Sequence, residues 1–115
     1  MPAPKPIPEG LHTVTASLKV RDTAKAIEFY KEAFGAAERG RFETPTGGIM
    51  HAEITIGDSV VMLGEEMPEM GAKSPLILGG TPVRLHIYTA DVDSLFARAT
   101  KAGATVMMPV ADQFW

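Results

Sequence analysis

A pattern of strand, helix and terminating glycine occurs twice in this chain and limits what it can fold into. Residues 13–20 alternate polar and apolar side chains, and residues 83–89 do the same, which is typical of half-buried strands. Each run is followed by an apolar stripe at helical spacing between a capping aspartate and a terminating glycine, which are Asp22 and Gly35 in the first copy and Asp91 and Gly103 in the second. This repeat predicts two related units in one α+β domain.

The first copy continues into further strand-like segments. Residues 38–44 predict a short edge strand, and two longer runs flank Gly57-Asp58, which is a hairpin signal. The first ten residues hold four prolines, so we expect a flexible arm there. The resulting division is an arm at residues 1–10, a first β-α-β-β-β module at 11–72, a linker at 73–81 and a partial second module of β-α-β order at 82–115.

Charge and composition exclude several classes of protein. The net charge of −3, without a basic run, argues against nucleic-acid binding. No apolar run approaches the ~20 residues that cross a bilayer. The 115 residues contain no cysteine, which excludes thiolate catalysis and cysteine-bound zinc. We therefore expect a cytoplasmic domain that interacts with neither nucleic acid nor membrane.

Four stretches in order carry a resemblance to a known superfamily. They are AIEFYKEAFGA (26–36), MHAEITIGDSVVMLGEE (50–66), SPLILGGTPVRLHIYTADVDSLFARATKAGATV (74–106) and PVADQFW (109–115). Together they resemble the vicinal oxygen chelate superfamily, which includes glyoxalase I, bleomycin-resistance proteins and extradiol dioxygenases, and within it the PhnB-like branch. The resemblance implies paired β-α-β-β-β modules around a cupped sheet, with the second module incomplete. Because PhnB-like chains continue beyond such a C-terminus, we expect a C-terminally truncated chain and a homodimer.

The resemblance also implies where a metal would bind. The superfamily's ligand positions fall on Thr15, Met62 and Arg84, none of which suits a divalent cation. We therefore predict no cofactor and no standard metal site. A displaced divalent metal site remains the fallback, with His51, Glu53 and His86 as its ligands.

The polar faces of the expected strands suggest a pocket for a small organic ligand. Arg84 is suited to clamping an anionic group, while Glu53 is suited to orienting His51 or acting as a general base. His51 and Glu53 are therefore the candidate catalytic residues. The candidate ligand-binding residues are Thr15, Ser17, His51, Glu53, Met62, Arg84, His86 and Tyr88.

Three functions remain open at this point. The leading one is a binding protein for a small organic molecule that works without the standard metal. The second is a metal-dependent lyase or dioxygenase of the same superfamily. The third is a non-catalytic interaction module that dimerises. Each of the candidate residues also has a structural alternative, such as an ion pair between Arg84 and Glu53 or Glu65.

Overall fold

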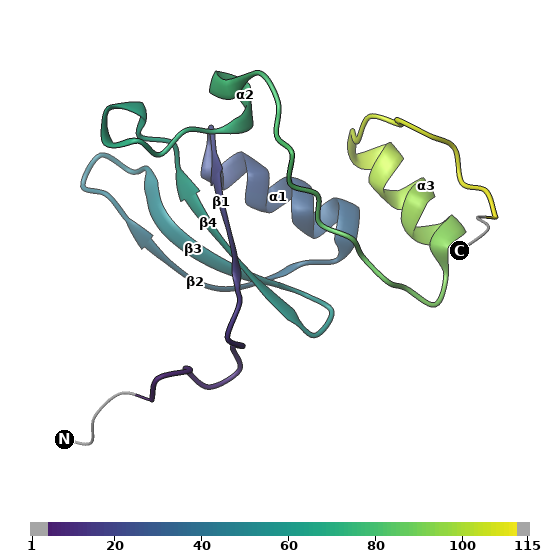
Figure 1. Ribbon diagram of the computed structural model, residues 1–115, viewed down its shortest axis with the longest axis horizontal. Coiled ribbons are helices and arrows are strands. Elements are labelled where there is room, and N and C mark those ends of the chain that lie inside the picture. The colour runs from purple at the N-terminus through teal and green to yellow at the C-terminus, as the bar shows by residue number, and fades with distance from the viewer. Residues whose placement is uncertain (1–4, 113–115) are drawn as a thin grey trace.

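A computed structural model describes residues 5–112 of the chain and gives a mixed four-stranded sheet with α1 packed on one face (Figure 1). The elements are β1 (Ala16–Val20), α1 (Thr23–Phe34), β2 (Ala37–Glu43), β3 (Ile49–Ile56), β4 (Ser59–Glu65), the 3-10 helix η1 (Pro68–Met70), α2 (Pro75–Leu78) and α3 (Val92–Ala102). The order in the sheet is β1-β4-β3-β2. The predicted α+β class and the first β-α-β-β-β module are therefore confirmed.

The pairing of the strands follows from the short connections between them. β2 and β4 each run antiparallel to β3, and Gly57-Asp58 forms the predicted hairpin turn between β3 and β4. β1 pairs with β4 in parallel, because α1 carries the chain from β1 to the opposite edge of the sheet. β2 is an edge strand, as predicted.

The core lies between α1 and the sheet. Ile27 of α1, Ala52 and Ile54 of β3 and Leu63 of β4 are completely buried there. Because side chains alternate along a strand, burial of one set sends the intervening residues to the opposite face. We call that opposite surface the open face.

Both long helices have the predicted ends. The side chains of Asp22 and Asp91 accept hydrogen bonds from the backbone of Lys25 and Ser94, one turn into their helices. Gly35 ends α1 in the left-handed conformation, with φ of 68°. Such a φ suits glycine, which has no Cβ to clash with the backbone.

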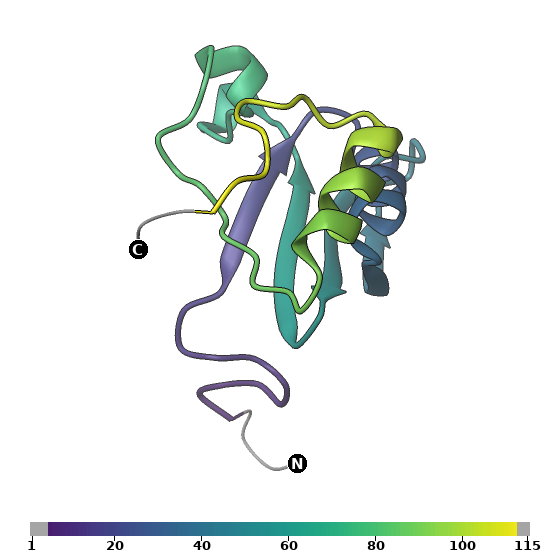
Figure 2. The ribbon, with the colours of Figure 1, turned by 90° about the vertical axis from the view of Figure 1, so that its right-hand side faces the viewer.

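The second unit differs from the prediction. α3 forms and lies beside α1 (Figure 2), but within the described residues neither 83–89 nor the segment after Gly103 forms a strand. A strand needs a neighbouring backbone to bond to, and residues 83–89 pair with none of the four strands described. The alternating pattern of residues 83–89 was therefore not enough to make this segment a strand. The segment expected as a linker, residues 73–81, contains the short helix α2.

Two expectations concern the N-terminal arm and the absence of a membrane-spanning segment. The described part of the expected arm, residues 5–10, contains neither helix nor strand, while the rest of the arm lies outside the described residues. Among the described helices, none has both the length and the apolar character needed to span a bilayer.

Candidate functional site

The open face brings together residues from all four strands. Strand alternation places Ser17 and Lys19 of β1 there, and the register aligns these two with Met62 and Gly64 of β4. Met62 in turn lies opposite Glu53 of β3. The paired residues on β2 are Gly40, opposite Glu53, and Phe42, opposite His51.

Glu53 is the centre of a charged group on this face. One of its carboxylate oxygens lies 3.5 Å from Nε2 of His51, and the other lies 3.5 Å from the Arg39 guanidinium. All three side chains are about one-third exposed, at 35% for His51, 28% for Glu53 and 36% for Arg39. These contacts are accessible to a ligand and loose enough to exchange for ligand contacts.

A shallow cavity of about 280 Å³ lies over this group. The Phe42 ring forms one wall, with its centroid 6.4 Å from that of His51, and it is 71% exposed. The cavity thus combines an exposed aromatic surface with a carboxylate, an imidazole and a guanidinium. Such a mixture of apolar wall and a few polar groups is typical of sites for small organic molecules.

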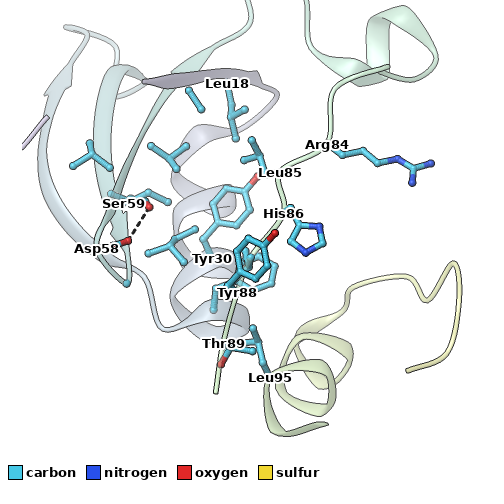
Figure 3. Close-up of a pocket in the computed structure, with 18 of the residues that line it drawn as sticks. Leu18, Tyr30, Asp58, Ser59, Arg84, Leu85, His86, Tyr88, Thr89 and Leu95 are labelled. Carbon is cyan, nitrogen blue, oxygen red and sulfur yellow. Dashed lines mark hydrogen bonds between the residues drawn. The ribbon is translucent and has the colours of Figure 1, made fainter. Parts of the chain in front are cut away.

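The second group of predicted residues lies elsewhere. Arg84, His86 and Tyr88 border a larger cavity of about 880 Å³, between α1, β1, β4 and the segment at 84–89 (Figure 3). Its inner wall is apolar, and burial raises the pKa of the Tyr30 hydroxyl there. Arg84 points away from the cavity in Figure 3. The rings of His86 and Tyr88 pack on each other instead, with centroids 4.8 Å apart.

The eight predicted ligand-binding residues therefore do not form one pocket. His51, Glu53, Met62 and Ser17 share the open face. Thr15 precedes β1, and its hydroxyl donates a hydrogen bond to the carbonyl of His12. Arg84, His86 and Tyr88 are separate because their segment is not a strand of the sheet, so the alternation of its side chains has no fixed relation to the open face. The structure therefore places these three residues around a different cavity from the one that His51 lines.

A divalent metal does not fit the side chains that the structure assembles. Within residues 5–112, no three His, Asp or Glu side chains come together in a way that would hold an ion. The fallback set of His51, Glu53 and His86 is not formed, because His86 lines the other cavity. The positions that the resemblance assigns to ligands carry a hydroxyl, a thioether and a guanidinium, which are poor donors for hard divalent ions.

Sequence reasoning did not assign a role to Arg39, Phe42 or Lys19. Arg39 lies at an irregularity of register between Glu38 and Gly40, so simple alternation along β2 does not place it. Phe42 could have been found, since it follows from pairing β2 with β3 across the turn at residues 45–48. Lys19 was on the predicted polar face, but only the fold shows its relation to Gly64.

Comparison with known proteins agrees with this fold. Residues 10–115 match the family Glyoxalase/Bleomycin resistance protein/Dioxygenase superfamily. The chain is 48% identical over 101 residues to the uncharacterized proteins Mb0911c of Mycobacterium bovis and Rv0887c of Mycobacterium tuberculosis. The match covers 85% of this chain but only 66% and 59% of those relatives, respectively.

Solved structures give the same fold at lower identity. A gene product of Arabidopsis thaliana superposes with a TM-score of 0.69 at 24% identity, covering 87% of this chain and 80% of that one. TioX from Micromonospora sp. ML1 superposes with a TM-score of 0.63 at 24% identity, covering 90% and 80%. At this identity the likeness concerns the fold alone. On the family match and the β-α-β-β-β module, the chain belongs to the glyoxalase/bleomycin resistance/dioxygenase superfamily.

Proposed function

We propose that this protein binds a small organic molecule on the open face of its sheet, and that binding does not depend on the metal site usual in the superfamily. The observation that carries the proposal is the cavity over Glu53, whose walls combine Phe42 with His51 and Arg39. Within the superfamily, we further place the chain in the PhnB-like branch, on the four sequence stretches that resemble it.

The chemistry of the cavity supports binding of a planar or partly apolar ligand. Phe42 offers an exposed ring face, and Met62 adds a flexible apolar side chain beside Glu53 on the next strand. The carboxylate of Glu53 can accept hydrogen bonds from a ligand hydroxyl or amine, while Arg39 can donate to a carbonyl. These opposite polarities lie within one small cavity and would fix the orientation of the ligand.

The donor set supports binding without a metal. A protein site for zinc or manganese needs three or more converging His, Asp or Glu donors, and on the described part of the open face His51 and Glu53 are the only two that converge. Metal analysis of protein purified without chelators tests this part of the proposal. We expect less than one-tenth of an equivalent of any divalent metal to survive dialysis, whereas one retained equivalent would contradict it.

A fragment titration followed by NMR tests the binding proposal. We expect small aromatic fragments to shift the backbone amides of His51, Glu53 and Met62, and we expect His51→Ala to weaken those shifts. His12→Ala is the matched control, because His12 is exposed and lies outside both cavities. The proposal would be overturned if fragments moved only the amides of residues 84–89, or if His51→Ala and His12→Ala behaved alike.

We also propose that two copies associate through apolar side chains in residues 76–88. Several large apolar residues there are at least half exposed, namely Leu76, Leu78, Val83, Leu85 and Tyr88. These residues belong to one segment of the chain, and large exposed apolar side chains that gather on a surface often mark a protein contact. The oligomeric state in solution tests this proposal.

A further inference from the structure

Lys19 lies on the open face in an unusual position. It is aligned with Gly64 in the parallel pairing of β1 and β4, and its side chain crosses directly over that glycine. A Cβ added at Gly64 would lie 2.8 Å from the Lys19 ammonium nitrogen. The ammonium group therefore occupies the space that a side chain at position 64 would fill, near the end of the inner strand β4.

Glycine at position 64 places this charge close to the cavity residues. Leu63 pairs with Ala52, so the antiparallel register brings Gly64 beside His51, which precedes Ala52. Met62, two residues before Gly64, lies on the same face opposite Glu53. The Lys19 ammonium group thus lies over Gly64, on the face that also carries Met62 and His51.

The charge of Lys19 is not compensated within the described part of the chain. Arg39 has Glu53 as its partner, and Arg41, on the opposite face, has Glu38. The Lys19 side chain has neither an ion pair nor a hydrogen bond among residues 5–112. Among the described strand residues of the open face, Lys19 and Arg39 are therefore two cations against the single carboxylate of Glu53, although the chain as a whole carries a net charge of −3. A half-buried cation without a partner favours an anion from outside.

We infer that the ligand of the open face is an organic monoanion, such as a carboxylate attached to an apolar or aromatic body, and that Lys19 binds its charged group. This inference rests on the proposed function and names the class of its ligand. The acid group would lie over Gly64 against the Lys19 ammonium group and beside His51. The body of the ligand would extend over Met62 toward the Phe42 ring. A single uncompensated ammonium group fits one negative charge better than a phosphate dianion.

A matched pair of probes separates charge from shape. 1-Naphthoate and 1-naphthamide share a ring system, but only the first is anionic near neutral pH. Each would be titrated into ¹⁵N-labelled protein, and the amide of Gly64 would be followed for the open face and that of Gly57 for the other cavity. The variants are Lys19→Met, which keeps an apolar stem, and Lys19→Arg, which keeps the charge. Lys25→Met, on the exposed side of α1, is the control for loss of one positive charge.

We expect 1-naphthoate to shift Gly64 and to bind about tenfold more tightly than 1-naphthamide, which is typical of one charge-assisted contact. Lys19→Met should remove this preference, while Lys19→Arg and Lys25→Met should retain it. Equal binding of both probes on the open face would overturn the inference and leave the proposed function standing. An unchanged affinity of Lys19→Met for 1-naphthoate would do the same. If neither probe moves any amide of the open face, the proposed function fails with it.

Discussion

The carboxylate of Glu65, the last residue of β4, accepts two hydrogen bonds from Thr23, the first residue of α1. The donors are the backbone N–H at 2.9 Å and the hydroxyl at 2.8 Å. The other oxygen of Glu65 accepts the backbone N–H of Asp22 at 2.9 Å. The first N–H groups of a helix have no hydrogen-bond partner within it. The Glu65 carboxylate supplies that partner at the beginning of α1 and so joins the helix to the sheet.

This contact predicts that Glu65→Gln destabilises the protein by about 1–3 kcal/mol, because the amide replaces a charged acceptor of three hydrogen bonds with a neutral one that has a single carbonyl oxygen. Urea unfolding followed by circular dichroism measures the change. Glu69→Gln is the matched control, since Glu69 is exposed in η1 and should change stability by less than about 0.5 kcal/mol. Equal effects of the two substitutions would contradict the role of Glu65.

The hydrogen-bonded carboxyl groups of Glu65 and Glu66 lead us to expect a loss of stability in acid. Burial tends to raise the pKa of Glu65, but the hydrogen bonds from Thr23 and Asp22 outweigh it and leave that pKa lowered. Hydrogen bonds from Ser74 and then Arg21 lower the pKa of Glu66. A carboxyl with a lowered folded pKa stabilises the fold above its unfolded pKa, here about 4.5, and this contribution is lost as pH falls further.

Melting temperatures at pH 7 and pH 3 test this direction. We expect the wild-type protein to lose more stability than Glu65→Gln between these two values, because the variant has no carboxyl to protonate at position 65. The difference between the two proteins should therefore narrow in acid. A constant difference across the range would show that the charge of Glu65 contributes nothing to stability.

Gly64 cannot accept a side chain at low cost. A Cβ there would lie 2.9 Å from the carbonyl oxygen of Met50, which belongs to the backbone and cannot move as the Lys19 side chain can. We expect Gly64→Ala to destabilise the protein by about 1–3 kcal/mol, as overpacking does. Gly40→Ala is the control, because among the described atoms nothing lies within 4 Å of a Cβ at position 40. Chemical unfolding of both variants measures the contrast, and equal stabilities would contradict the close approach.

Arg98 joins α3 to the rest of the molecule. Its guanidinium donates to the backbone carbonyls of Glu32, at 2.6 Å, and Lys31, at 3.1 Å, near the end of α1. Since no residue within α3 is fully buried in the part of the protein described, these two bonds matter more than they would in a well-buried helix. We expect Arg98→Met to speed amide hydrogen exchange across α3 while leaving the sheet unchanged. Lys101→Met is the control, and equal exchange in both variants would contradict this role.

Local sequence signals predicted the helix ends and the hairpin turn of the first module well, because these features are determined locally. Capping by Asp22, termination at Gly35 and the Gly57-Asp58 turn depend on neighbouring residues alone. The alternating residues 83–89 show the limit of such signals. Alternation states which side chains would share a face, but a strand forms only where another backbone offers hydrogen bonds, and that depends on the whole fold.

The candidate site was predictable to a similar extent. His51 and Glu53 were correctly paired, because two positions along one strand share a face whatever the register. Arg39 and Lys19 depended on relations between strands, namely an irregular register in β2 and the parallel alignment of β1 with β4. Arg84 was assigned to the same face only because a strand was expected at 83–89. Since that strand does not form, Arg84 lies at the other cavity instead.

The exposed apolar residues of 76–88 predict association in solution. Light scattering coupled to size exclusion should give about twice the chain mass of 12.3 kDa at protein concentrations near those of structural work. We expect Leu76→Asp and Tyr88→Asp to shift the protein toward the monomer, because each places a charge at a surface that association would bury. Met70→Asp is the control, since Met70 is 77% exposed but lies in η1, outside that segment. A wild-type protein that stays monomeric, or a Met70→Asp effect equal to the other two, would exclude this surface as the contact.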